Sequence, residues 1–219
     1  MESIKGDGSA EPGRSAYHHG DLRNALLRAA TELASAGGPE AVVLREAARR
    51  VGVSPTAAYR HFAGQGELLQ AVKDLGQEEL AVSMRAAVDE CPDTGDPGEV
   101  AMSRAKAVGR GYLRFAFAEP GLFRTAFCHN PPAPASDPAG HAGKEDYPSY
   151  ALLAAVLDDL VTTGRMPPSR RPGAEITAWS AVHGLAQLVI DGPLHDLAPA
   201  ELAAATESLL HTTTTGMCT

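Results

Sequence analysis

The chain has 219 residues, of which 44% are hydrophobic, and a formal net charge of -8 at pH 7. This composition supports a buried core and excludes global disorder. No apolar run approaches the roughly 18–20 residues of a membrane span, and the N-terminal segment lacks the apolar stretch of a signal peptide. We therefore expect a cytoplasmic protein with no membrane partner. Cys91, Cys128 and Cys218 are widely scattered without C-x-x-C spacing, which favours unpaired thiols.

The charge is distributed unevenly along the chain. Residues 14–62 contain seven arginines and four acidic residues, whereas the part from residue 64 onward contains eleven basic and twenty acidic residues. Only the N-terminal part is therefore suited to approach a polyanion such as DNA. The asymmetry would also orient the molecule on such a partner.

The N-terminal segment predicts an arm and two helices. Residues 1–16 lack hydrophobic periodicity and predict a flexible arm. Asp21 is a candidate N-cap for a first helix, which the sequence Gly37-Gly38-Pro39 would end. A second, short helix is expected over about 43–50, ending near Gly52 with two arginines in its last turn, where cations suit the helix dipole.

Two further helices follow closely. Ser54-Pro55 combines an N-cap residue with proline at the first helical position, which predicts a third helix running to about His61. Gly64 and Gly66 then interrupt the helical pattern before a long fourth helix that begins near Glu67. Its expected apolar stripe consists of Leu68, Val72, Leu75 and Val82.

The remainder of the chain also shows helical periodicity. Helices are expected over 99–118, 147–163, 173–191 and 199–212, with a short apolar segment at 122–127. Residues 129–146 are rich in Pro, Ala and Gly and predict a loop. No stretch alternates as a strand would. The fold class is therefore all-α with about nine helices, divided into an arm (1–16), a helix-turn-helix domain (17–66) and a larger helical domain (67–219).

Residues 41–62 have the spacing of a helix-turn-helix. Ala47 and Ala48 are small enough for two helices to approach, Gly52 supplies the turn, and Ser54 starts the second helix. The N-terminal turn of such a helix fits a DNA major groove. On spacing alone, a plain αα-hairpin is an equally good interpretation.

A resemblance to a known family decides between these interpretations. The runs Y-H-H-G-D-L-R-N-A-L-L, L-R-E-A-A-R-R-V-G-V-S-P-T-A-A-Y-R-H-F and G-E-L-L resemble the N-terminal domain of TetR-family transcriptional regulators over about residues 17–72. The resemblance implies a three-helix DNA-binding domain with 55–61 as the recognition helix, carried on a homodimer that binds double-stranded operator DNA. The candidate DNA-binding residues are Arg45, Ser54, Pro55, Thr56, Ala57, Tyr59, Arg60, His61 and Gln65.

Two positions depart from the family pattern. Members usually have lysine, a phosphate contact, at the position of Gln65, and serine or threonine, a helix cap, at the position of Val43. Losing the lysine removes part of the salt-dependent DNA affinity. Losing the cap costs roughly 0.5–2 kcal/mol of stability unless another group replaces it.

The C-terminal half carries a second, weaker resemblance. The segment A-W-S-A-V-H-G-L resembles a Trp-x-x-x-His-Gly element of one subgroup of these regulators. Trp179 and His183 share one helix face. They would either line an effector cavity or belong to a packed core with His183 hydrogen-bonded to a neighbour, and the helix could instead form a dimer seam. Gly184 would permit close approach of a helix.

Two further sets of residues are candidates for ligand binding and dimerisation. Apolar residues at helical spacing suit a pocket for a small apolar or amphipathic effector, although such stripes more often form plain core. With Trp179 and His183, the pocket candidates are Met84, Met102, Tyr112, Phe115, Phe123 and Phe127. The resemblance implies a dimer formed by the last two long helices. The dimer candidates are Leu185, Leu188, Leu202 and Leu209.

No catalytic or metal site is expected. Ser180, His183 and Asp191 lack the G-x-S-x-G elbow of a hydrolase, and no phosphate-binding loop is present. Cys128, His129 and His141 do not have metal-ligand spacing. No enzyme activity, metal or cofactor is therefore predicted. The favoured function is a homodimeric repressor released from a near-palindromic operator by the effector. The alternative is a helical interaction protein with weakened DNA binding and no effector.

Overall fold

The structure, a computed structural model, describes residues 19–129 and 147–219, and within these ranges it contains helices and no strand. This confirms the all-α class and the number of helices. The α-helices are α1 His19–Gly37, α2 Leu44–Val51, α3 Pro55–Ala58, α4 Gln65–Asp89, α5 Pro97–Ala118, α6 Pro120–Phe127, α7 Pro148–Thr162, α8 Ala174–Ile190 and α9 Pro199–Cys218. Two 3-10 turns, η1 Pro39–Ala41 and η3 Pro168–Arg170, complete the described elements.

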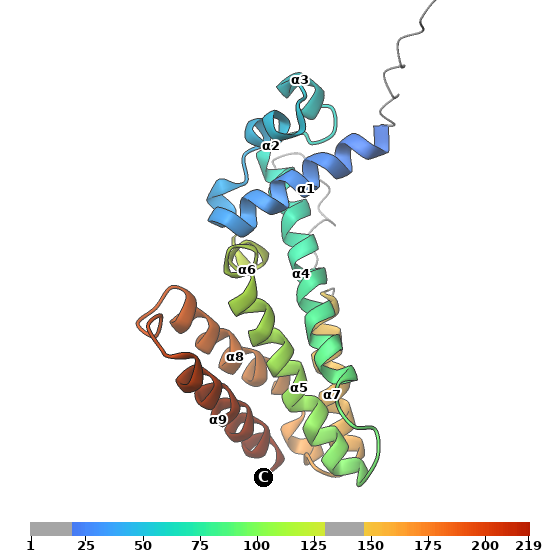
Figure 1. Cartoon of the computed structure of the whole chain (residues 1–219). Helices are drawn as coiled ribbons and strands as arrows, with labels where there is room; N and C mark the ends of the chain where they lie inside the picture. The colour runs from blue at the N-terminus through green and yellow to red at the C-terminus, as the bar shows by residue number, and fades with distance from the viewer. Residues whose placement is uncertain (1–18, 130–146) are drawn as a thin grey trace, which may run out of the picture.

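The helices form two connected groups (Figure 1). Helices α1, α2 and α3 lie together at one end of the molecule, with α3 at its tip. Helix α4 starts there and runs to the other end beside α5 and α7, while α8 and α9 form an outer hairpin. The short α6 lies between α1 and the body and contacts α1, α4 and α5.

Local signals explain most helix ends. The side chains of Ser54 and Asp96 accept hydrogen bonds from the backbone N–H groups of Ala57 and Glu99, and so cap α3 and α5. Helix α1 begins at His19, so Asp21 is its third residue and not its N-cap. Helix α9 extends to Cys218, six residues past the expected end, because its last turns carry no Gly-Pro break before the C-terminus.

The buried face of α4 differs from the predicted stripe. Leu68 and Val72 are buried, but Val82 is 62% exposed. Helix α1 crosses α4 near its start, whereas α5 and α7 lie beside α4 further along (Figure 1). The buried positions therefore move around the axis to Leu80, Met84 and their neighbours, which a single stripe does not anticipate.

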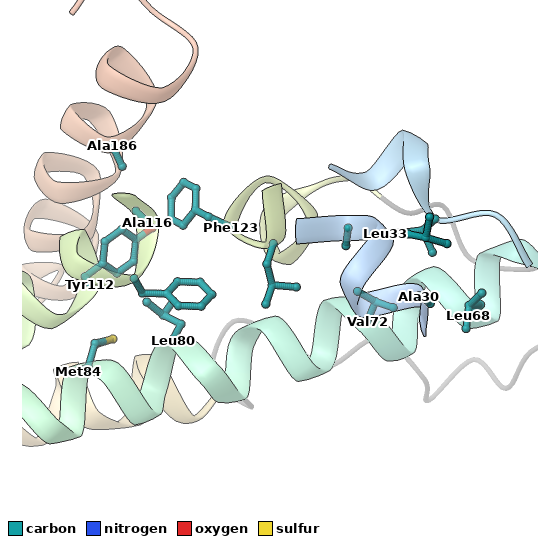
Figure 2. Close-up of a cluster of buried hydrophobic side chains, with 14 of the residues drawn as sticks. Ala30, Leu33, Leu68, Val72, Leu80, Met84, Tyr112, Ala116, Phe123 and Ala186 are labelled. Atoms are coloured by element: carbon teal, nitrogen blue, oxygen red, sulfur yellow. The ribbon is translucent and has the colours of Figure 1, made fainter. Parts of the chain in front are cut away.

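One hydrophobic cluster connects the two ends of the molecule. Figure 2 shows Ala30, Leu33, Leu68 and Val72 where α1 packs on α4. Further along, it shows Met84 of α4 together with Tyr112 of α5 and Ala186 of α8. Phe123 of α6 lies between these two parts (Figure 2). The core is therefore continuous from the helix-turn-helix to the C-terminal helices.

Several expectations fall outside the described residues. The predicted arm (1–16), most of the loop over 129–146 and His141 belong to this group. No described helix is long and apolar enough to cross a membrane. The three cysteines are free thiols. The domain boundary expected at 66/67 falls in the first turn of α4 and stays a prediction.

Candidate DNA-binding surface and ligand cavity

The helix-turn-helix forms through two local devices. Gly52 ends α2 in the left-handed conformation, with φ 79°, which glycine adopts without strain. Ser54 Oγ then accepts a hydrogen bond from the Ala57 N–H at 3.2 Å and starts α3, which has proline at its first position. The chain reverses between these two residues, so α3 packs across α2.

The recognition helix is shorter than predicted. It ends at Ala58 instead of His61, because the N–H groups of Arg60 and His61 bond to carbonyls three residues back and tighten the backbone into turns. Ala58 and Phe62 are fully buried and anchor the segment to the core. The opposite side of the segment faces solvent.

The candidate DNA-binding residues lie on this solvent-facing side. Ala57 and His61 are partly buried, and the others are exposed: Arg45, Ser54, Pro55, Thr56, Tyr59, Arg60 and Gln65. Tyr59 is 47% exposed although it is a large aromatic residue. Most of the candidates are therefore open to solvent in and around the helix-turn-helix.

The arginines around this surface differ in their partners. Arg49 and Arg50 both contact the carboxylate of Glu46, and their hydrogen bonds lower the Glu46 pKa to about 2. Within residues 19–129 and 147–219, Arg45 and Arg60 make no ion pair. No carboxylate of the described chain therefore competes with an anionic partner for these two guanidinium groups.

The two departures from the family pattern are visible at helix starts. Val43 precedes α2 and supplies no side-chain cap. Gln65 is the first residue of α4 and is exposed. The N-terminus of α4 has a different stabilising group, since Glu67 accepts a hydrogen bond from the Ala63 N–H at 2.6 Å. Arg23 lies 4.7 Å above the Phe62 ring and further ties α1 to this region.

A narrow cavity lies between α4, α5, α7, α8 and α9. The space open to the centre of a water molecule is about 60 Å³. Ligand pockets usually measure about 300–1,000 Å³, so this cavity is smaller than a typical ligand pocket. Its lining side chains are mostly apolar: Gln77, Met84, Ala105, Val108, Gly109, Tyr112, Phe127, Tyr147, Ser149, Tyr150, Leu153, Val156, Leu157, Ala178, Trp179, Val182, Leu210, Thr213, Thr214 and Met217.

Four of the eight candidate effector residues line this cavity, and four lie elsewhere. Met84, Tyr112, Phe127 and Trp179 line it. Phe115 and Phe123 are instead buried in the main core. Met102 packs in a second cluster with Cys218, and His183 packs against the Phe123 and Phe127 rings. The apolar periodicity does not separate cavity residues from core residues, because both face inward.

Tyr112 is the centre of a buried hydrogen-bond chain. The Trp179 indole N–H donates to Tyr112 Oη at 3.2 Å, and Tyr112 Oη lies 2.7 Å from His183 Nδ1. The phenol oxygen has two lone pairs, so it accepts the indole proton whichever of Tyr112 Oη and His183 Nδ1 carries the proton between them; the other ring nitrogen, Nε2, lies 3.5 Å from Gln187 Nε2. Burial raises the pKa of Tyr112 and lowers the pKa of His183, so both side chains are neutral near pH 7.

The cavity wall also contains a polar pair that the sequence pattern does not indicate. Gln77 of α4 is 2% exposed, and its Nε2 donates to the Ala126 carbonyl at 3.0 Å. Its Oε1 accepts a hydrogen bond from Ser149 Oγ of α7 at 3.2 Å. An available signal was the position of a glutamine between Val72 and Leu80, among the apolar residues of α4.

Helix α6 joins the cavity to the helix-turn-helix. A methyl group on Gly121 would lie 2.3 Å from the carbonyl oxygen of Ala34 in α1, so the two backbones are in close contact there. At the other end of α6, Gln77 and Lys73 of α4 donate to the carbonyls of Ala126 and Cys128. The eight-residue helix therefore touches α1 at one end and the cavity wall at the other.

No group of three or more metal-ligating side chains occurs among the residues that the structure describes. Cys128 and His129 lie at the end of α6, and burial raises the pKa of the Cys128 thiol. Ser180 is exposed on α8, with no hydrogen bond to His183 within the described chain.

Two sequence models of one regulator family match the chain. The model for "Bacterial regulatory proteins, tetR family" matches residues 26–72, and the model for "Tetracyclin repressor-like, C-terminal domain" matches residues 105–213. The chain belongs to the TetR family. It is a DNA-binding transcriptional regulator with the helix-turn-helix in α2 and α3. Membership in the Trp-x-x-x-His-Gly subgroup of the TetR family stays a prediction.

Solved structures share this TetR-family architecture. A protein of unknown function from Rhodococcus sp. RHA1 has a TM-score of 0.74 and 25% identity, covering 94% of this chain and 100% of that chain. The TetR-family transcriptional regulator PfmR from Thermus thermophilus has a TM-score of 0.53 and 18% identity, covering 87% of this chain and 94% of that chain. The second similarity concerns the fold alone.

Curated relatives match a smaller part of the TetR-family chain. The nucleoid occlusion factor SlmA of Vibrio vulnificus (strain YJ016) is 32% identical over 108 residues, which cover 49% of this chain and 52% of the relative. The corresponding factor of Vibrio cholerae is 31% identical over the same length. The chain spans about half the length of the curated relatives it matches.

Proposed function

We propose that this TetR-family chain is a homodimeric repressor that binds a near-palindromic operator through α3 and is released when a small apolar or amphipathic effector enters the cavity. The observation that carries the proposal is the exposed tip of α3, held in place by buried Ala58 and Phe62. In a dimer, two such tips would enter major grooves about 34–36 Å apart or a multiple of that distance.

The chemistry of the tip supports separate roles for its residues. Thr56 is small and exposed at the start of α3, which suits contact with base edges or a thymine methyl. Tyr59, Arg60 and Arg45 surround it and suit phosphate contacts, which position the helix without reading sequence. Gln65 would supply a neutral hydrogen bond where other family members supply a charge.

The size of the cavity supports effector release. A ligand larger than a few water molecules does not fit a space of about 60 Å³ without displacing the surrounding helices. Phe127, at the end of α6, lines the cavity, and Gly121 at the start of α6 packs on α1. Displacement of α6 by a ligand would therefore shift α1 and change the separation of the two DNA-binding tips.

One face of α8 supports a dimer. Ile176, Ser180, Gly184 and Leu188 are spaced four residues apart, and Ile176 and Leu188 are 54% and 44% exposed. Apart from the backbone of its own helix and its chain neighbours, a methyl group on Gly184 would meet no atom of the described residues within 4 Å, so Gly184 serves no contact with another described helix of the protomer. We propose that it permits close approach of the partner's α8.

The other dimer candidates differ in how deeply their side chains are buried in the protomer. Leu185 is buried within the protomer and is therefore not available to a partner. Leu202 and Leu209 of α9 are half-buried and remain in the proposed interface with α8. A symmetric contact through α8 and α9 would place the same residues of both copies opposite one another.

The experiment is the isolation of bound fragments from random genomic DNA, followed by affinity measurements at several salt concentrations. We expect a near-palindromic site bound by two protomers, with affinity falling steeply as salt rises. The bound fragment then serves to test release by candidate effectors. Absence of binding to any fragment at low salt would overturn the proposal.

A helical interaction protein with weakened DNA binding is the second candidate. Exposed Gln65 at the start of α4, in place of a lysine, favours it. The same experiment separates the two functions. Binding of a partner protein, with equal and weak affinity for all DNA fragments, would favour the second candidate.

A further inference from the structure

The cavity wall contains no charged side chain among the described residues. The lining set includes no Asp, Glu, Lys, Arg or His, and its ionisable members are tyrosines. His183 lies behind Tyr112, and burial lowers its pKa, so it contributes no positive charge near pH 7. An ion transferred into this cavity would lose its hydration and gain no counter-charge. The wall therefore disfavours ligands of either charge.

The hydroxyl proton of Ser149 is already used in a hydrogen bond within the protein. The Ala126 carbonyl only accepts hydrogen bonds, so the amide nitrogen of Gln77 must face it, at 3.0 Å. Gln77 Oε1 consequently faces Ser149 Oγ and receives its proton, at 3.2 Å. Ser149 Oγ retains lone pairs but has no further proton to donate. Towards a ligand it is an acceptor.

The same accounting applies to the second polar oxygen. Tyr112 Oη receives the Trp179 indole proton and shares a second hydrogen bond with His183 Nδ1, so both of these partners belong to the protein. Ser149 Oγ of α7 is therefore the wall oxygen that can accept a hydrogen bond from a ligand and has no proton left to donate.

We infer that the cavity binds an uncharged, mainly apolar molecule that carries a hydroxyl group, and that Ser149 Oγ accepts the hydroxyl proton. This inference rests on the proposed effector role of the cavity and narrows it to one chemical class. A charged amphiphile of the same length binds more weakly, because the described lining residues offer it no counter-charge. An ether of the same shape also binds more weakly, because it has no proton to donate to Ser149 Oγ.

The chain provides its own reporter of occupancy. Trp179 is its single tryptophan and lines the cavity, so intrinsic fluorescence of the full-length protein reports changes there. The probes are hexan-1-ol, its isomer methyl pentyl ether, hexylamine and hexanoate, the last two being ionised at pH 7. We expect a saturable change with hexan-1-ol, about 2–10-fold weaker binding of the ether, and at least about tenfold weaker binding of both ions.

A pair of variants assigns the signal to the cavity. Ala105 of α5 lines the cavity, and Ala105→Leu fills part of it. Ala118→Leu adds the same atoms at the exposed end of the same helix. We expect Ala105→Leu to weaken hexan-1-ol binding by about tenfold or more and Ala118→Leu to leave it unchanged. Equal weakening in both variants would overturn the location.

Three results would overturn the ligand class. They are equal affinity for hexan-1-ol and either ion, equal affinity for the alcohol and the ether, and no saturable change with any probe. Operator binding measured on the same protein keeps the two proposals distinguishable. A preference for the alcohol without DNA binding retains the ligand class and refutes the repressor function, whereas operator binding without this preference does the reverse.

Discussion

Replacing Gly121 with alanine tests the joint between α6 and α1. The added methyl carbon would lie 2.3 Å from the carbonyl oxygen of Ala34 and 2.4 Å from that of Ser35. Carbon and oxygen atoms approach to about 3.3 Å at closest, so one helix must move by about 1 Å. Both obstacles are backbone atoms, which rotation of a side chain does not relieve.

The expected cost of Gly121→Ala follows from overpacking, which destabilises by about 1–3 kcal/mol. For a chain of this size, that loss lowers the melting temperature by about 2–12 °C. Urea unfolding gives the free energy, and thermal unfolding gives the melting temperature. Gly216→Ala is the matched control, because its methyl group meets nothing within 4 Å in α9. The control should be neutral or stabilising by up to about 1 kcal/mol.

The same variant also tests the proposed coupling. If α6 sets the position of α1, Gly121→Ala should weaken binding to the operator more than binding to random DNA, because only the operator requires a fixed separation of the two tips. Fluorescence anisotropy with the two duplexes measures this ratio. Unchanged stability would refute the close contact, and unchanged operator preference would refute its role in DNA recognition.

Three further predictions concern single side chains. Tyr59→Ala should weaken binding to operator and random duplexes alike, at unchanged stability because Tyr59 is 47% exposed; wild-type affinity for both duplexes in an anisotropy titration would contradict this. Thr56→Ala should alter the ranking of operator variants in a competition assay, where an unchanged ranking would argue against base contact. Burial lowers the pKa of His183, so the folded state binds fewer protons than the unfolded state and stability falls as pH drops below about 6.5. Urea unfolding between pH 7 and pH 5 should show a smaller fall for His183→Asn than for the wild type, and equal falls would contradict the assignment.

Features specified by neighbouring residues were predictable from the sequence. The turn at Gly52 and the start of α3 at Ser54 each follow from a few adjacent positions. The end of α3 was harder to predict, because Tyr59 to His61 adopt tight turns that helix propensity does not distinguish from an α-helix.

Features that depend on distant partners were not predictable. Gln77 and Ser149 are 72 positions apart in sequence, and only the fold brings them together in the cavity wall. Similarly, nothing near Gly184 indicates that its surface faces away from the protomer, or that Leu185 beside it faces inward. Periodicity identifies the inward residues of a helix, but the position of the neighbouring helices determines which of them border a cavity.

The narrowness of the cavity gives the proposed switch its energetic basis. A ligand shifts a conformational equilibrium only to the extent that it binds the two states differently. A cavity that already fitted the effector would bind it without favouring any rearrangement. Here the available space is about 60 Å³, so an effector of several carbon atoms binds only a state in which the helices have separated. Because Phe127 of α6 lines the cavity and Gly121 of α6 packs on α1, we expect that separation to shift α1 and, with it, the DNA-binding tip.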